Sequence, residues 1–251
     1  MVVIRSCSAA DAAQIAAVQR AGWFAAYEGI IPGEIIDQVT APDEGARVRQ
    51  TFRTRPWQRM IVAVAGKRET PRPGVPVAPG IVGYASFGPE TDVLAGRWPP
   101  QLTGAGRDGQ VAELYALYIR PAWWSTGTGR ALMDQVLART SAVRYRSVVL
   151  WVLRDNTRAR RFYERAGFAP DGAAHRLDRL GGVTEVRYQR TLAALRRRRG
   201  TRPGLDRAPP AGAGNNDVLM HPGMPAAADA LVPTLRPCLP DGTATGAHAG
   251  R

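Results

Sequence analysis

Apolar and polar positions along the first 195 residues predict strands and helices that follow one another. Five short apolar runs predict strands, at residues 2–7, 60–65, 81–87, 111–119 and 147–153. Two further strands are expected on either side of Gly181-Gly182, the last over residues 183–192. Helical spacing and capping residues predict helices over residues 12–27 and 33–39, after residue 129, and over 156–166. This order predicts a mixed α/β fold, a largely antiparallel sheet with one β-α-β crossover at its centre.

The composition changes near residue 196. Residues 196–199 are four consecutive arginines, and residues 200–251 hold eight of the 20 prolines and eight of the 27 glycines. No periodic apolar pattern continues beyond this point, so the segment buries too little surface to offset the entropy of ordering it. We therefore expect one domain over residues 1–195 and a disordered tail over residues 196–251.

The formal net charge of +13 comes almost entirely from arginine. Such a charge attracts nucleic acid, an anionic membrane surface or a polyphosphate cofactor, although a bias toward arginine over lysine explains it equally well. No run of about 18 apolar residues predicts a membrane span, and the N-terminus lacks the layout of a signal peptide. Cys7 and Cys238 lie at opposite ends of the chain, which indicates neither a disulfide framework nor a metal site. A reducing cytoplasm is the expected location.

Two glycines, Gly127 and Gly129, stand where the strand at residues 111–119 has passed through a turn into the next helix. Glycine lets the backbone approach a ligand closely, and the first N–H groups of a helix have no partner within it. A strand–Gly-x-Gly–helix junction is thus a cradle for phosphate. The alternative is a tight turn without a ligand.

Asn156 follows the strand at residues 147–153, and Tyr163 lies seven residues later on the same helical face. The amide of Asn156 can donate to and accept from an extended amide ligand. The alternative is that Asn156 caps a helix and Tyr163 packs in the core. The conjunction of this pair with the glycine turn favours a ligand site.

Four segments together resemble the GNAT superfamily of N-acetyltransferases: residues 117–121, 127–129, 156–163 and 166–168. The resemblance implies a six- or seven-stranded, mostly antiparallel sheet flanked by about four helices. It also implies an enzyme that transfers an acetyl group from acetyl-CoA to a primary amine of a small molecule or protein, by direct attack and without a metal.

The resemblance also implies site residues. The backbone of Leu117, Tyr118 and Ile119 would pair with the pantetheine arm as an added strand does. The backbone amides that would hold the pyrophosphate are those of Ser125, Thr126, Gly127, Thr128, Gly129 and Arg130. Asn156 would bond the pantetheine amides, and Tyr163 would protonate the departing thiolate or merely orient the thioester.

The loop departs from the family's usual pattern at residues 124–126, where Trp, Ser and Thr replace the usual Gln, Arg, Lys or Gly. Backbone N–H groups remain, and the hydroxyls of Ser125, Thr126 and Thr128 are expected to compensate in part. Three side chains are candidates for the cofactor phosphates, with plain surface positions as the alternative: Arg120, Arg130 and Arg160.

Glu113 is the candidate base that deprotonates the amine. A carboxylate within an apolar strand costs free energy unless it is paired or has a function, and the alternative is a salt bridge to an arginine. In some relatives the base is a Glu on the next strand, but Trp151 stands at that position here. Aromatic candidates for the acceptor pocket are Trp23, Tyr27, Tyr115 and Trp151.

Two other functions stay open: a GNAT-fold module that senses CoA without turnover, and a nucleic-acid-binding protein that uses the basic charge and residues 196–199. Nucleic acid is not the expected partner, and neither is a membrane. The sequence leaves a homodimer open and does not identify the amine.

Overall fold

The computed structural model describes residues 2–43, 45–55, 57–66, 71, 79–90 and 111–192. The expected tail at residues 196–251 and most of two loops, residues 66–80 and 88–109, lie outside the described residues. The division into a domain and a tail therefore stays a prediction.

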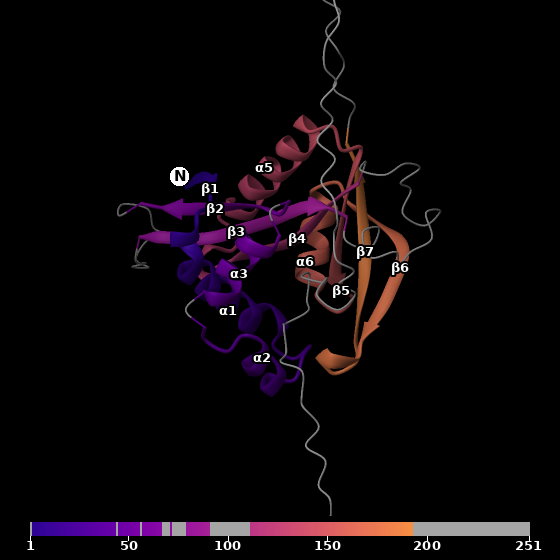
Figure 1. The fold of residues 1–251 in the computed structure, drawn as a ribbon. Helices are drawn as coiled ribbons and strands as arrows, with labels where there is room; N and C mark the ends of the chain where they lie inside the picture. The colour runs from indigo at the N-terminus through magenta and orange to yellow at the C-terminus, as the bar shows by residue number, and fades with distance from the viewer. Residues whose placement is uncertain are drawn as a thin grey trace, which may run out of the picture.

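Seven strands form one sheet in the order β1-β2-β3-β4-β5-β7-β6 (Figure 1). The strands are β1 Val3–Ser6, β2 Arg59–Ala65, β3 Gly80–Pro89, β4 Val111–Ile119, β5 Ser147–Leu153, β6 Ala169–Leu177 and β7 Val183–Thr191. Only β4 and β5 pair in parallel, and the other five neighbouring pairs are antiparallel. The predicted fold class, with its mostly antiparallel sheet and central crossover, is confirmed.

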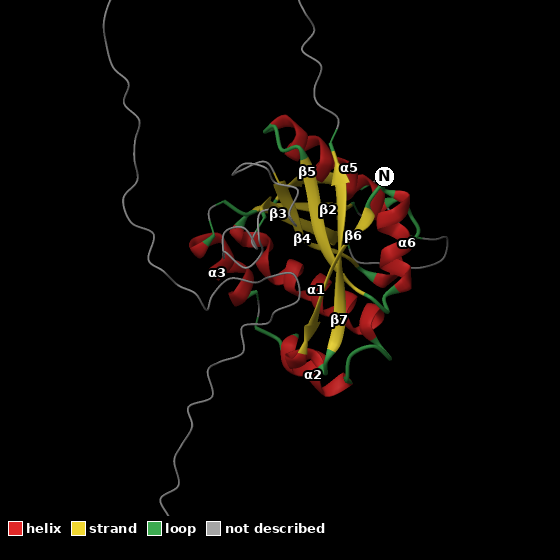
Figure 2. Ribbon diagram, turned by 90° about the vertical axis from the view of Figure 1, so that its right-hand side faces the viewer, coloured by secondary structure: helices red, strands yellow, loops and turns green. Residues whose placement is uncertain are grey.

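Helices cover both faces of this sheet (Figure 2). The α-helices of the described residues are α1 Ala12–Tyr27, α2 Gly33–Val39, α3 Ala46–Thr54, α5 Thr128–Ala142 and α6 Thr157–Arg165. α1 and α3 pack on one face, which we call the α1 face, and α5 and α6 on the other, the α5 face. The crossover helix between the two parallel strands is α5, as the sequence predicts.

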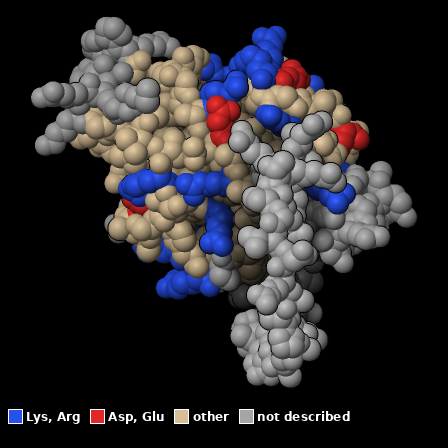
Figure 3. Space-filling model, turned by 90° about the horizontal axis from the view of Figure 1, so that it is seen from above, with Lys and Arg blue, Asp and Glu red and all other residues tan. Residues whose placement is uncertain are grey.

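The surface in Figure 3 carries more basic than acidic groups, in keeping with the net charge of +13. Within the described part of the chain, no helix is both long and apolar enough to span a membrane.

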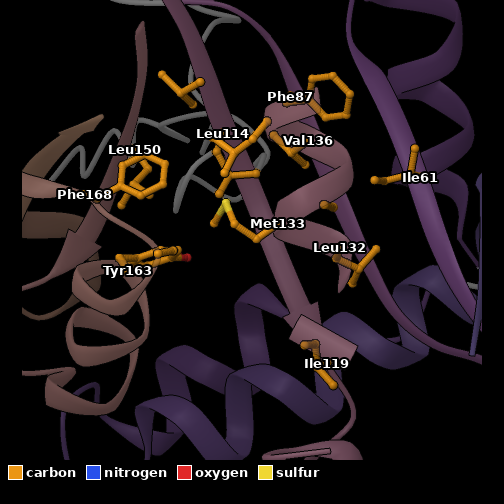
Figure 4. Close-up of a cluster of buried hydrophobic side chains, with 14 of the residues drawn as sticks. Ile61, Phe87, Leu114, Ile119, Leu132, Met133, Val136, Leu150, Tyr163 and Phe168 are labelled. Atoms are coloured by element: carbon orange, nitrogen blue, oxygen red, sulfur yellow. The ribbon is translucent and has the colours of Figure 1, made fainter. Parts of the chain in front are cut away.

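On the α5 face, α5 buries Leu132, Met133 and Val136 against the strands (Figure 4). Their strand partners include Leu114 of β4 and Leu150 of β5, each at most 2% exposed. Burying one such side chain contributes about 1.5–3 kcal/mol, so this layer fixes the position of α5 against β4 and β5. The start of α5, where the glycine turn lies, is held in place by the same packing.

A bulge in β4 shapes the centre of the sheet. Ser86 and Phe87 of β3 pair with Ala116 and Leu114, so Tyr115 is an extra residue on β4. An inserted residue interrupts the alternation of side chains and bends the strand. Pairing between β4 and β5 stops at Leu114 and Leu150, although both strands continue. The two parallel strands thus diverge beyond the bulge.

Candidate functional site

The backbone turns sharply between β4 and α5. Ser125 has a φ of 63° and Gly127 a φ of 88°, both in the left-handed region. Gly127 is the N-cap of α5, and a Cβ built on it would meet no atom within 4 Å. A side chain would therefore fit at this position, and it is the left-handed backbone conformation that favours glycine there.

The backbone N–H groups of this turn are without an acceptor in the part of the chain that the structure describes. Among the described residues, none of the six backbone N–H groups from Ser125 to Arg130 donates to a carbonyl or side-chain oxygen, and the next one, of Ala131, donates to Gly127. Successive unpartnered N–H groups in left-handed and helical conformations, at the positive end of a helix dipole, form an anion site. The geometry fits a phosphate or pyrophosphate.

Two of the three predicted hydroxyls are occupied within the loop. Thr126 Oγ1 donates to the carbonyl of Trp123 at 2.8 Å, and it lies 2.9 Å from Thr128 Oγ1. Thr128 is only 2% exposed. These hydroxyls stabilise the turn, so the anion is left to the backbone N–H groups and to Ser125.

Sequence reasoning missed Arg158, in the first turn of α6. Its guanidinium carbon lies 4.3 Å from the centroid of the Trp124 ring, and Nη2 donates to Ser125 Oγ at 3.3 Å. In this arrangement a cation of α6 lies beside the N–H groups at the start of α5. The available signal was its position two residues after Asn156, because that helix begins beside the glycine turn.

The three arginines predicted to meet the phosphates have other partners. Arg130 Nε donates to Asp134 at 2.9 Å, one helical turn further on. Arg120 Nε donates to the carbonyl of Ile81 at 3.0 Å, and Arg160 Nε donates to the Tyr188 hydroxyl at 2.9 Å.

Asn156 is the N-cap of α6. Its Oδ1 accepts a hydrogen bond from the backbone N–H of Ala159 at 3.0 Å, and the residue is 8% exposed. The capping alternative is therefore confirmed for one end of the amide. No hydrogen bond from Nδ2 is found among the described residues, so this group can donate to a ligand.

Tyr163 projects from α6 and lies beside Leu150 and Phe168 (Figure 4). It is 9% exposed, and within the described part of the chain no hydrogen bond to its hydroxyl is found. Burial, with a smaller contribution from Tyr118, raises the pKa of Tyr163 above its ordinary value. Its phenol thus holds its proton at neutral pH.

Tyr163 belongs to a group of phenols that the diverging strands bring together. The hydroxyls of Tyr27 and Tyr118 lie 3.4 Å apart. Burial raises the pKa of Tyr118 to about 12. Burial also raises the pKa of Tyr27, and the neighbouring Tyr118 and Tyr163 add to this effect. The rings of Tyr27 from α1, Tyr118 from β4 and Tyr163 from α6 therefore lie close to one another.

Glu113 is fully buried on β4. Its neighbours Ala112 and Leu114 belong to the core of the α5 face, so Glu113 points to the α1 face. Its charge adds to the effect of burial in raising the pKa of Tyr115. Tyr163 lies on a helix of the opposite face, so the two predicted catalytic side chains approach the sheet from opposite sides.

Sequence reasoning also missed buried charges on β7. Arg187 is 1% exposed, with Nη1 3.0 Å from Glu90 Oε1 and Nε 2.6 Å from Asp171 Oδ2. Glu185 is also 1% exposed, and its Oε1 lies 2.6 Å from His175 Nε2. The available signal was charge at alternate positions, Glu185 and Arg187, on either side of the apolar Val186.

Trp151 lies next to these charges. It pairs with Arg187 across the strands, and its ring centroid lies 4.5 Å from that of His175. A search of the described ranges finds no group of three or more His, Cys, Asp and Glu side chains that could hold a metal ion.

Comparison with known proteins links this geometry to a family. The family model described as acetyltransferase (GNAT) family matches residues 37–168. An uncharacterized N-acetyltransferase of Mycobacterium tuberculosis (strain ATCC 25618 / H37Rv) is 35% identical over 104 residues, which cover 40% of this chain and 65% of that protein. The chain therefore matches just under two thirds of this relative's length.

Solved structures show the same fold. The PaiA N-acetyltransferase from Thermoplasma acidophilum, in complex with coenzyme A, has a TM-score of 0.52 at 16% identity, covering 76% of this chain and 99% of that chain. A phosphinothricin acetyltransferase from Sinorhizobium meliloti, in complex with acetyl-CoA, has a TM-score of 0.51 at 16% identity, covering 76% of this chain and 88% of that chain.

Proposed function

The chain belongs to the acetyltransferase (GNAT) family, and from this premise we propose that it transfers an acetyl group from acetyl-CoA to a primary amine by direct attack. The observation that carries the proposal is the row of N–H groups from Ser125 to Arg130, which have no acceptor among the described residues. They lie where β4 and β5 diverge, within reach of a cofactor that enters between the strands. The amine belongs to a small molecule or a protein.

Backbone and side chains share the binding of acetyl-CoA in this proposal. Residues 125–130 and Arg158 hold the pyrophosphate. On the side toward β5, residues 117–119 of β4 have no strand partner, because that pairing ends at Leu114 and Leu150. Leu117 and Tyr118 therefore pair with the pantetheine arm, while the Ile119 carbonyl already accepts a bond from Trp124 Nε1 at 2.9 Å. Asn156 Nδ2 donates to a pantetheine carbonyl.

Tyr163 is the proposed acid. The amine nitrogen forms a bond to the thioester carbonyl carbon, the carbon–sulfur bond breaks, and the thiolate takes the phenol proton. The raised pKa keeps that proton on Tyr163 until negative charge develops on the sulfur. The acylated nitrogen loses its remaining positive charge by releasing a proton, and the phenolate takes up a proton in exchange through solvent.

Glu113 is the proposed base. Its carboxylate is buried on the α1 face, to which β7 also turns Glu185 and Arg187. A carboxylate in this position accepts the proton that the ammonium must lose before its nitrogen can attack. Because Tyr163 approaches from the other face, acid and base act on opposite sides of the reacting carbon.

The test is release of free thiol from acetyl-CoA in the presence of a panel of primary amines, with the acetylated product identified by mass. We expect thiol and product in equal amounts. Binding of acetyl-CoA without turnover of any amine would support a sensing module instead, and no binding at millimolar acetyl-CoA would refute the proposal. The arginines at residues 196–199, on which a nucleic-acid function depends, lie outside the described residues.

A further inference from the structure

Glu185 is a buried carboxylate that the proposed acetyl transfer does not use. Its side chain is 1% exposed, and Oε1 lies 2.6 Å from His175 Nε2. Oε2 is buried and has no hydrogen-bond partner among the described residues. A buried carboxylate oxygen without a hydrogen bond costs free energy, so its position calls for a donor.

Glu185 faces the group of phenols. On β7, Val186 and Tyr188 belong to the core of the α5 face, so Glu185 points to the α1 face. Its strand partner Leu153 packs in one cluster with Trp23 of α1. The charge of Glu185 is also one of the causes that raise the pKa of Tyr27 and of Tyr118. The carboxylate therefore lies near the hydroxyls that surround the proposed acid.

The nearest cation on the same strand already has other partners. Arg187 contacts Glu90 and Asp171, at 3.0 Å and 2.6 Å. The buried charged side chains of the described residues are Asp11, Glu90, Glu113, Glu185 and Arg187, so buried carboxylates outnumber buried guanidinium groups. A buried group of charges with excess negative charge, in a protein of net charge +13, favours a cationic ligand.

We infer that the Glu185–His175 pair is the docking point for the ammonium group of the acceptor, with Glu185 Oε2 accepting one of its hydrogen bonds. This inference rests on the proposed function and names the class of its substrate. The acceptor is a primary amine that binds as a single ammonium and carries an apolar or aromatic body.

The side chains around the Glu185–His175 pair indicate this class of acceptor. The cluster beside Glu185 is apolar and aromatic, with Trp23, Tyr27 and Leu153 among its members, so it suits an apolar body. His175 is 29% exposed, which makes the pair reachable from the surface at β6. The basic surface disfavours amines with several positive charges.

Binding of two matched probe pairs to the full chain tests the inference, with acetyl-CoA affinity measured separately. The first pair is 2-phenylethylamine and 2-phenylethanol, which differ in the ammonium group. The second is alanyl-phenylalanine amide and its N-acetyl derivative, which represent a peptide N-terminus. We expect the wild type to bind at least one cationic member about tenfold or more tightly than its neutral partner. The pair that shows the preference identifies the source of the ammonium.

Glu185→Gln keeps the shape of the side chain and removes its charge. We expect this variant to lose the preference for the cationic probe while its acetyl-CoA affinity stays within about twofold, because the carboxylate lies away from the anion site. Glu28→Gln removes an exposed charge at the end of α1 and should keep the preference. His175→Gln should weaken the preference and leaves β7 unaltered.

Two outcomes would overturn the inference: a wild type without any cation preference, and a folded Glu185→Gln variant that retains it. If Glu185→Gln does not fold, as thermal unfolding would reveal, His175→Gln decides in its place. Loss of acetyl-CoA binding by the wild type would instead count against the proposed function, so the two failures are distinguishable.

Discussion

The guanidinium of Arg158 lies over Trp124, with its central carbon 4.3 Å from the centroid of the indole ring. At the position of Trp124, the resemblance to the GNAT superfamily led us to expect Gln or Arg. Arg158 belongs to α6 and also donates to Ser125. The loop therefore has a cation beside it that is not one of its own residues. The cation beside this loop thus comes from a second helix, α6.

Arg158→Ala should weaken acetyl-CoA binding about tenfold, because a charge-assisted contact to a phosphate is lost at a partly exposed site. Titration calorimetry at two salt concentrations measures this change. The affinity of the variant should also depend less steeply on salt than that of the wild type. Arg161→Ala, which removes an exposed arginine from the same helix, is the matched control. Equal effects of the two changes would show that only general charge matters.

Asn156→Asp separates the two uses of the amide. The Asp carboxylate still accepts from the Ala159 N–H, so the helix cap and the unfolding temperature should be preserved. The Nδ2 donor is lost, and a negative charge faces the pantetheine carbonyl, so acetyl-CoA affinity should fall about tenfold or more. Asn156→Ala should lower stability as well, by about 1 kcal/mol. If the Asp variant binds acetyl-CoA as tightly as the wild type, Asn156 serves as a helix cap and does not contact the cofactor.

Tyr163→Phe should lower kcat about 100-fold or more and leave the Kd for acetyl-CoA unchanged, because the hydroxyl is proposed to act only when the thiolate departs. The raised pKa predicts that the acid form persists above pH 7, so deprotonation of Tyr163 should not reduce the wild-type rate up to pH 10. Steady-state kinetics from pH 7 to 10 provide the measurement. A kcat within twofold of the wild type would restrict Tyr163 to orienting the thioester.

Asp11 links stability to pH. The side-chain hydrogen bonds from Arg5, the largest cause, help to lower the pKa of Asp11 from 3.8 to about 2. The charged form therefore stabilises the fold above pH 4, and this stability is lost as the pH falls toward 2. Asp11→Asn should cost about 1–2 kcal/mol at pH 7, and the difference from the wild type should shrink below pH 4.

Urea unfolding of both proteins at pH 7 and pH 3 measures that difference. Asp134→Asn is the control, because Asp134 and its partner Arg130 are 56% and 66% exposed and should contribute little. A constant difference between Asp11→Asn and the wild type at both pH values would contradict the assignment.

The sheet and the glycine turn could be predicted because their signals are local. Continuous apolar runs indicated β4 and β5, and Gly127 indicated a backbone conformation that other residues resist. The resemblance then related the turn to Asn156 and Tyr163, whose common helix face follows from their spacing. Sequence reasoning also named both roles of Asn156, the helix cap and the ligand contact, and favoured the ligand contact.

The rest depends on contacts between distant segments. The bulge at Tyr115 changes which side chains of β4 face α1, and nothing at that residue signals it. Arg158 meets Trp124 because two helices begin side by side, and Arg187 meets Glu90 across the sheet. Such partners depend on tertiary packing, so the sequence could not show which arginine lies beside the glycine turn.

Amide NMR of the isotope-labelled full chain, titrated with coenzyme A, tests the central proposal most directly. The N–H groups of Ser125 to Arg130 have no acceptor among the described residues, so a bound pyrophosphate should move their resonances more than those of any other backbone segment. Asn156 should show a matching change in its side-chain NH₂ signal. If coenzyme A binds while the resonances of residues 125–130 stay in place, the cofactor site lies elsewhere and the proposed mechanism fails with it.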